Sequence, residues 1–199
     1  MVVPMVLCSM ALGHLAPVEF KMQGKYVEGC ACQAPCTCEM TGLVMGCEGV
    51  GAFEFTGGDV GGASLAGCRA AYATVPGKWV ILYIDAPDAV QKAAAEKMMR
   101  YGLDGFGKVE AVRNAKISMT GSGGNCRVTV GSYFTLTTKP MIGGDGKSAL
   151  VYGNMHDRIH PTVMGGTTIA CKYHDGKRKF DLKGSNAFFN EHLSVNGKL

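Results

Sequence analysis

Trp79-Val-Ile-Leu-Tyr-Ile84 runs directly into Asp85-Ala-Pro-Asp-Ala-Val-Gln-Lys-Ala-Ala-Ala-Glu-Lys-Met-Met-Arg-Tyr-Gly102, and the change of pattern between these stretches decides the predicted fold class. The first stretch is a continuous apolar run that follows a turn, which is typical of a central buried strand. The second predicts a helix over about 87–101, because apolar residues recur on one helical face. Asp85 is a candidate cap at its start, and Gly102 suits its C-terminal end.

Much of the remaining chain alternates between apolar and polar residues, which is the pattern of half-buried strands. Such segments lie at 51–56, 126–130, 133–137, 167–173 and 177–182. Asp175-Gly176, between the last two segments, predicts a tight hairpin. We therefore predict an α+β fold of mostly antiparallel strands with one principal helix at about 87–101.

Composition favours a folded, turn-rich protein. The chain has 199 residues, of which 47% are hydrophobic and 29 are glycine, so it can bury one sizeable core. Its net charge of +4 is mild and no long basic run is present, so we expect no nucleic-acid partner. We predict a single α+β domain over 18–195. Gly121-Ser-Gly-Gly124 suggests the alternative of two subdomains joined near 121–125.

Residues 1–17 resemble a secretory leader. Val2 to Leu15 is largely apolar and carries small residues near its end, although no Lys or Arg precedes it. The run is too short to cross a bilayer, and no other segment is a candidate, so we predict that the protein is not transmembrane. We expect it to be periplasmic or extracellular if the leader (a signal peptide) is cleaved, and otherwise cytoplasmic.

Five of the nine cysteines lie close together in the sequence. We call Cys30, Cys32, Cys36, Cys38 and Cys47 the cysteine cluster. Alternate residues of a strand share a face, so the first two would point the same way, as would the next two. Ala34-Pro35 between the pairs favours a bend that brings them together. Such a cluster is a soft-metal site, a disulfide framework or a redox centre.

The spaced motifs resemble a widespread, uncharacterised bacterial family that is known only as a domain of unknown function. The family shares a Cys-x-Cys … Cys-Pro-Cys signature near its N-terminus. The matching segments are Gly29-Cys-Ala-Cys32, Pro35-Cys36, Gly46-Cys-Glu48, Gly57-Gly-Asp-Val60, Pro76-Gly77, Asp85-Ala-Pro-Asp-Ala-Val-Gln-Lys92 and Gly102-Leu-Asp-Gly105. In this chain Thr37 replaces the signature proline, and the proline stands earlier, at Pro35. The resemblance covers roughly residues 25–195.

Genes of that family tend to lie near genes for predicted metal-binding membrane proteins. The resemblance therefore implies a metal-handling membrane protein as a partner. Thiolate is a soft ligand that favours Cu(I), zinc and iron–sulfur clusters. The Cys-x-Cys-x3-Cys-x-Cys spacing matches neither the usual zinc pairs nor the common ferredoxin patterns. We therefore rank copper first and zinc second, with the cysteine cluster as ligands, in a protein that buffers or delivers the ion rather than an enzyme.

Two alternatives use the same cysteines. Cleavage of the leader would remove Cys8 and leave eight cysteines, and an even number in an exported protein favours disulfides. In that case the first four cysteines of the cluster would be linked, for example, to Cys47 or Cys68, and the protein would be a disulfide-stapled interaction domain. The third reading is a thiol redox protein, although the chain lacks the usual Cys-x-x-Cys motif.

His156 and His160 form a secondary candidate site. They lie four residues apart, so they would share a face on a helix, and imidazole is a credible copper ligand. Pro161 argues against a helix that continues there. The alternative is a polar loop whose histidines are solvated or hydrogen-bonded.

Overall fold

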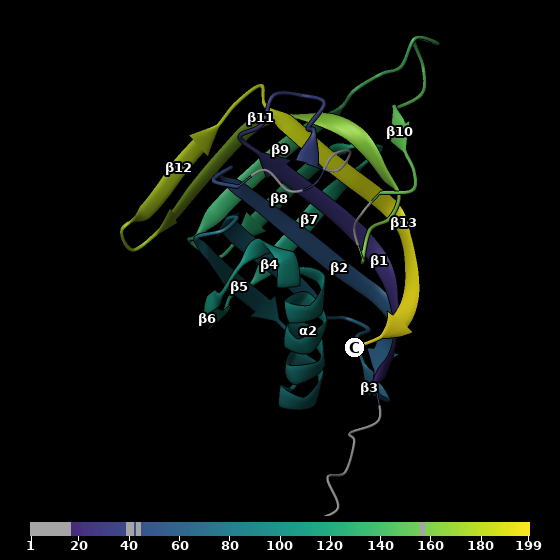
Figure 1. Ribbon diagram of the computed structural model, residues 1–199, viewed down its shortest axis with the longest axis vertical. Helices are drawn as coiled ribbons and strands as arrows, with labels where there is room; N and C mark the ends of the chain where they lie inside the picture. Colours follow the sequence, from purple (N-terminus) through teal and green to yellow (C-terminus); the bar gives the residue numbers. More distant parts are fainter. Residues whose placement is uncertain (1–16, 39–41, 43–44, 156–157) are drawn as a thin grey trace, which may run out of the picture.

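One large, curled sheet makes up most of the protein (Figure 1). The computed structural model describes residues 17–38, 42, 45–155 and 158–199. The strands are β1 (Glu19–Cys30), β2 (Gly49–Val60), β3 (Ala63–Ser64), β4 (Arg69–Val75), β5 (Trp79–Asp85), β6 (Val109–Asn114), β7 (Ile117–Ser122), β8 (Asn125–Val130), β9 (Phe134–Pro140), β10 (Val151–Tyr152), β11 (Val163–Asp175), β12 (Arg178–Leu182) and β13 (Asn186–Lys198). The described helices are α2 (Ala89–Gly102) and a short 3-10 turn, η1 (Asp104–Phe106).

The sheet order is β6-β5-β4-β2-β1-β13-β11-β9-β8-β7. Strand β3 pairs with β2, while β10 and β12 pair with β11. The pairs are antiparallel apart from β5 and β6, which run parallel and are connected through α2. This connection is the expected use of a helix, because parallel neighbours need a long crossover.

The predicted α+β class is wrong, because 57% of the chain is in strands and the sheet curls into a half-barrel. The long strands run through adjacent glycines, which are typical of turns when they are read alone. Gly57 and Gly58 belong to β2, which continues to Val60. A Cβ on Gly58 would lie 2.1 Å from the carbonyl oxygen of Lys21 on β1, so glycine permits the close approach of the two strands.

Helix α2 begins two residues later than the start of the predicted range of 87–101. Asp88 caps it, since its Oδ1 accepts a hydrogen bond from the backbone N–H of Gln91 at 2.8 Å. Asp85, the expected cap, instead accepts a hydrogen bond from the N–H of Ile117 at 3.0 Å and so joins β5 to β7. The helix lies against β2, β4 and β5 (Figure 1). Its buried residues are the alanines and methionines Ala94, Ala95, Met98 and Met99.

Apolar residues are buried on both faces of the sheet. The face under α2 holds Met98 and Met99 together with side chains of β1, β2, β4 and β5. The other face joins Ile81 of β5 to Val128 of β8, although these strands lie far apart in the sheet order. Curling of the sheet brings the two ends together and removes this second apolar face from water.

The predicted hairpin at Asp175-Gly176 is confirmed, because β11 and β12 pair on either side of it and Gly176 has φ of +62°. Asp175 also closes the half-barrel: its carboxylate accepts hydrogen bonds from Tyr83 of β5 and Arg113 of β6. Residues 121–125 form the connection between β7 and β8 within the same sheet.

Within the described ranges, no helix is both long and apolar enough to cross a bilayer. The predicted leader, including Cys8, lies outside the described residues apart from its last position, residue 17.

Candidate metal centre

The cysteine cluster is located where β1 and β2 separate. Cys30 is the last residue of β1 and pairs with Gly49, the first residue of β2. The loop between them carries the other four cysteines. Ala31 donates a backbone hydrogen bond to the carbonyl oxygen of Glu48 at 2.7 Å, which holds the base of the loop together. This bond keeps the segment that follows β1 beside the segment that precedes β2.

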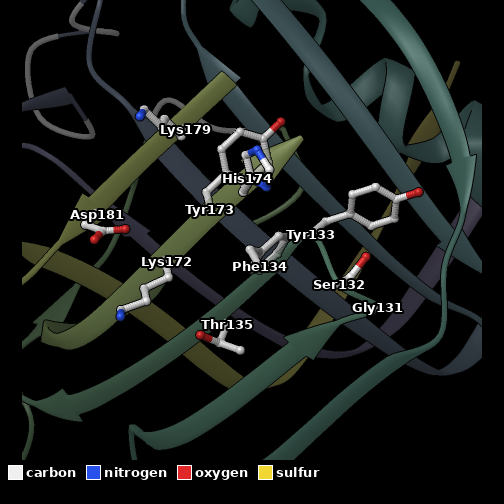
Figure 2. A pocket seen from close by; sticks show the side chains of 10 residues that line it. All are labelled: Gly131, Ser132, Tyr133, Phe134, Thr135, Lys172, Tyr173, His174, Lys179 and Asp181. Carbon is white, nitrogen blue, oxygen red and sulfur yellow. The ribbon is translucent and has the colours of Figure 1, made fainter. Parts of the chain in front are cut away.

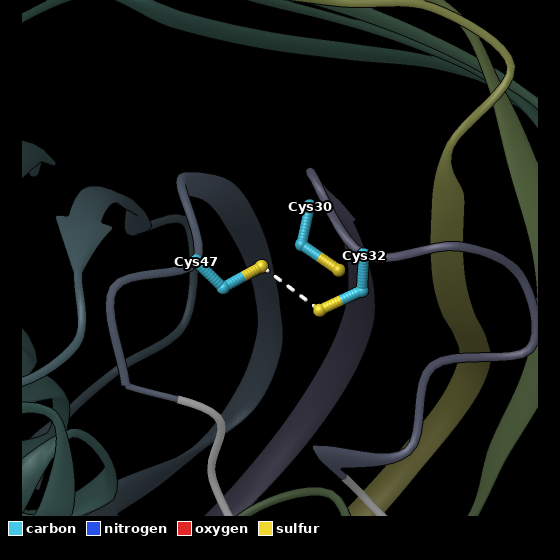
Figure 3. Close-up of side chains that lie close together, drawn as sticks. All are labelled: Cys30, Cys32 and Cys47. Atoms are coloured by element: carbon cyan, nitrogen blue, oxygen red, sulfur yellow. Dashed lines mark hydrogen bonds between the residues drawn. The ribbon is translucent and has the colours of Figure 1, made fainter.

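The five sulfurs fall into two groups of three that share Cys32. Cys30, Cys32 and Cys47 form the first group, and Cys32, Cys36 and Cys38 form the second. Within each group all sulfur atoms lie within 4.8 Å of one another. The Sγ of Cys32 lies 2.9 Å from that of Cys47 and 3.9 Å from that of Cys38. Figure 3 shows the first group, with Cys47 facing the two cysteines of the opposite segment.

The sequence predicted this convergence, but partly for the wrong reason. Cys30 alone belongs to a strand, whereas Cys32, Cys36 and Cys38 lie beyond the end of β1. Strand alternation therefore does not align the sulfurs. The bend around Pro35 and the hydrogen bonds of the loop bring them together.

Disulfides do not connect the cysteines of the described residues. This holds for all eight of them, namely Cys30, Cys32, Cys36, Cys38, Cys47, Cys68, Cys126 and Cys171. Cys68, the expected distant partner of the cluster, is buried, and its thiol donates to the carbonyl oxygen of Gln91 at 3.8 Å. The disulfide framework predicted as an alternative is therefore not the arrangement that the structure shows.

Asn186, the first residue of β13, anchors the loop, and sequence analysis missed it. Its fully buried side chain accepts a hydrogen bond from the N–H of Cys36 at 3.0 Å, and its Nδ2 lies 3.7 Å from the Sγ of Cys30. Its backbone N–H donates to the carbonyl oxygen of Cys32 at 2.9 Å. One asparagine therefore positions three of the cysteines. Asn186 is distant in the sequence, so no local signal reveals this role.

A small cavity of about 30 Å³ lies against the cluster. Four cysteines line it, namely Cys30, Cys36, Cys38 and Cys47, together with Glu28, Gly49, Tyr72, Thr74, Pro76 and Phe106. Glu28 is the acidic residue of this wall. Both Tyr26 and Tyr72 donate hydrogen bonds to its Oε2, the latter at 2.7 Å. Sequence analysis also missed Glu28, although its place two residues before Cys30 in a strand puts both on one face.

The thiols affect one another's ionisation. A hydrogen bond from Cys30 is the main cause that lowers the pKa of Cys36 to about 2 and the pKa of Cys47 to about 6. The pKa of Cys30 is raised, chiefly because its proton is held in the bond to Cys36. Burial is the main cause that raises the pKa of Cys32 to about 12. At neutral pH the cluster therefore contains both thiolates and the protonated thiols that stabilise them.

Burial has the largest effect on the carboxyl of Glu28, and it raises the pKa of this group above its ordinary value. The charge of His160 and the hydrogen bonds from Tyr26 and Tyr72 act in the opposite direction, while Cys36 adds to the increase. The folded protein therefore holds the Glu28 proton more tightly than the unfolded chain does.

Glu28→Gln is expected to remove a pH-dependent loss of stability in the reduced, metal-free protein. As pH rises above about 4.3, the unfolded chain releases the Glu28 proton first, so the free energy of unfolding of the wild type falls until the raised pKa is passed. Glutamine has no proton to lose. Urea denaturation from pH 4 to 8 should show the variant gaining stability relative to the wild type as pH rises. A difference that stays constant with pH would contradict this account of Glu28.

Of the two histidine candidates, the one that the structure describes does not join the sulfurs. His156 lies outside the described residues. His160 is buried, and its ring stacks on Tyr26 with centroids 4.2 Å apart and lies 6.4 Å from the ring of Phe53. It belongs to neither group of three thiols. The structure therefore places His160 beside the Glu28–Tyr26 pair rather than among the candidate ligands.

A larger, open cavity of about 450 Å³ lies elsewhere, on β9, β11 and β12 (Figure 2). Its wall contains no cysteine. Lys172, His174 and Lys179 line it together with Asp181, as Figure 2 shows. Because opposite charges are mixed and exposed there, this surface makes no defined ligand set.

Comparisons with known proteins find similarity at the level of shape alone. No family model matches the chain, and no curated protein matches it. An acetoacetate decarboxylase from Legionella pneumophila subsp. pneumophila str. Philadelphia 1 aligns with a TM-score of 0.40 and 9% identity, covering 100% of this chain and 92% of that chain. The enduracididine biosynthesis enzyme MppR aligns at 0.38 and 12%, with coverage of 92% and 88%. A further acetoacetate decarboxylase aligns at 0.30 and 9%, with coverage of 93% and 90%. Similarity at this level transfers no activity to this chain.

Proposed function

We propose that the protein binds a soft metal ion, Cu(I) first and Zn(II) second, through the cysteine cluster. The observation that carries the proposal is the convergence of five thiols, none of them in a disulfide, in two groups that share Cys32. Sulfur-only donor sets favour soft ions over magnesium or calcium. The carboxyl of Glu28 lies in the wall of the adjoining cavity, and its ionised form would be stabilised by a cation bound there.

The number of thiols in each group supports copper over zinc. Sulfurs on one ion lie about 4.0 Å apart in a plane of three and about 3.8 Å apart in a tetrahedron, so the 3.9 Å between Cys32 and Cys38 suits either geometry. Each group, however, offers three ligands and not four. Structural zinc sites take four ligands in a tetrahedron. Three-coordinate thiolate binding is therefore the better match for Cu(I).

Exposure of the cluster suits exchange of the ion with a partner. Cys30, Cys32, Cys38 and Cys47 are half-buried, so ligands of another protein can reach them. Buffering or delivery requires this accessibility, because the ion must pass from one set of thiols to another. The partner that fits this role is a metal-handling membrane protein.

Anaerobic titration of the reduced protein with Cu(I), against a coloured Cu(I) chelator, tests the proposal. We expect the wild type to withdraw copper from the chelator. A variant with Cys30, Cys32, Cys36 and Cys38 all replaced by serine should withdraw none. Cys126→Ser is the matched control, because Cys126 lies on β8 outside both groups of three, and it should bind like the wild type. Failure of the reduced wild type to compete would refute the proposal.

A thiol redox role is the second candidate, because the sulfurs of Cys32 and Cys47 are only 2.9 Å apart. A disulfide needs about 2.05 Å, so a small movement would join them. Oxidation by glutathione disulfide would proceed in two steps. The Cys47 thiolate attacks the reagent and releases one glutathione thiolate. The sulfur of Cys32 then displaces the second as the intramolecular bond forms, and the proton of the Cys32 thiol passes to a departing glutathione thiolate.

Differential alkylation with peptide mass spectrometry separates the two roles. A redox protein would return to its dithiol form with thioredoxin-like reductants and would form the Cys32–Cys47 bond at the potential of the glutathione couple. A metal carrier loaded with Cu(I) should resist this oxidation, because both sulfurs are then occupied. Equal oxidation of loaded and metal-free protein would favour the redox role.

A further inference from the structure

The two groups of three thiols also indicate how many ions the cluster holds. We propose that it binds two Cu(I) ions in one dinuclear centre, with the Cys32 thiolate bridging them. One ion would be held by Cys30, Cys32 and Cys47, and the other by Cys32, Cys36 and Cys38. This inference rests on the proposed function and extends it from a metal site to a defined cluster.

The number of sulfurs in the cluster is the reason for proposing a bridging thiolate. Two ions with three sulfur ligands each require six positions, and the cluster supplies five thiols in two groups of three. The requirement is met when one sulfur serves both ions. Cys32 is the residue that belongs to both groups. A thiolate can act in this way because it retains further lone pairs after it has bound one soft ion.

The space beside the sulfurs is large enough for two ions. The cavity against the cluster measures about 30 Å³, and a single water-sized atom needs roughly 10–15 Å³ on the same measure. Its wall includes cysteines of both groups, Cys30 and Cys47 from one and Cys36 and Cys38 from the other. Both groups therefore border one cavity, while Cys32, the residue that they share, lies outside its lining and within 4.8 Å of the sulfurs of each group.

Binding of both Cu(I) ions would require the sulfurs of Cys32 and Cys47 to move apart. Cys32 and Cys47 are 2.9 Å apart, whereas two sulfurs on one three-coordinate ion lie about 4.0 Å apart. The second group needs less change, since Cys32 and Cys38 are already 3.9 Å apart. Cys32 and Cys47 both lie in the loop beyond the paired ends of β1 and β2, so the first group can widen without breaking the sheet.

Native mass spectrometry of the reduced protein, titrated anaerobically with Cu(I), tests the inference. The wild type should take up two ions, and X-ray absorption should show copper–copper scattering. Cys38→Ser and Cys47→Ser should each retain one ion, because each leaves one group intact. Cys32→Ser removes a ligand from both groups, so it should lose the two-ion form and the copper–copper scattering. Cys126→Ser should behave like the wild type.

The outcomes separate this inference from the proposed function. A wild type that stops at one ion, or that binds two ions without copper–copper scattering, overturns the bridged centre but leaves copper binding intact. Two ions retained by Cys32→Ser would also overturn it. No uptake by the wild type overturns both proposals. Circular dichroism of each metal-free variant establishes that it is folded, and Cys32→Ala provides a second test at the bridging position.

Discussion

Asn186→Ala is expected to weaken Cu(I) binding by about 10- to 100-fold, which is the usual cost of losing a residue that orients metal ligands. Its buried side chain contacts both the backbone of Cys36 and the sulfur of Cys30, so alanine frees the loop on one side of the cluster. The N–H of Cys36 also loses its acceptor, which should lower the free energy of unfolding by about 2 kcal/mol. Chelator competition and urea denaturation measure the two effects.

Asn190→Ala is the matched control for this variant. Asn190 lies on the same strand, β13, but its Nδ2 donates to the carbonyl oxygen of Thr162 at 2.8 Å, and this contact is exposed. Its replacement should change the free energy of unfolding by less than about 0.5 kcal/mol and leave copper affinity unchanged. If Asn186→Ala bound copper as tightly as Asn190→Ala, the anchoring role of Asn186 would be rejected.

Asp175→Ala is expected to lower the free energy of unfolding by about 3 kcal/mol. Asp175 is 8% exposed, and its carboxylate accepts hydrogen bonds from the Tyr83 hydroxyl at 2.9 Å and from Arg113 at 2.6 and 2.9 Å. These bonds join the β11–β12 hairpin to β5 and β6 across the curled sheet. Removal of the carboxylate leaves the buried hydroxyl of Tyr83 without this acceptor. Urea denaturation measures the loss.

The pair formed by Lys198 and Glu19 provides the control for Asp175. Its closest atoms are 3.9 Å apart and both side chains are exposed, so Lys198→Ala should cost less than about 0.5 kcal/mol. Asp175→Asn keeps one acceptor oxygen and should fall between the wild type and Asp175→Ala. Equal stability of Asp175→Ala and Lys198→Ala would show that this contact does not hold the half-barrel closed.

Predictions from local pattern succeeded where the structure depends on residues close in the chain. The Asp175-Gly176 turn follows from the backbone freedom of glycine, and the continuous apolar run at 79–84 forms β5, a strand with hydrogen-bonded neighbours on both sides. Convergence of the cluster was also predictable, because four cysteines occur within nine residues and Cys47 returns at the start of β2.

Fold class was not predictable by the same means. Gly57 and Gly58 suit a turn when they are read alone, yet they continue β2 because β1 comes too close for a side chain. Asp85 suits a helix cap, yet its carboxylate accepts a hydrogen bond from the N–H of Ile117, and Asp88 caps α2 instead. In each case a contact with a distant strand outweighs the local preference.

The order of residues in the chain is sufficient to place five thiols in one short segment at the end of β1, since backbone connectivity limits how far they can separate. It cannot reveal their supporting residues. Asn186 meets Cys36 across 150 positions, and Tyr72 meets Glu28 across 44, because the antiparallel sheet brings β13 and β4 beside the ends of β1 and β2. The spacing of the cysteines thus specifies the candidate ligands. Strand pairing places Asn186 and the buried carboxyl of Glu28 beside them, and burial of both sheet faces drives that pairing.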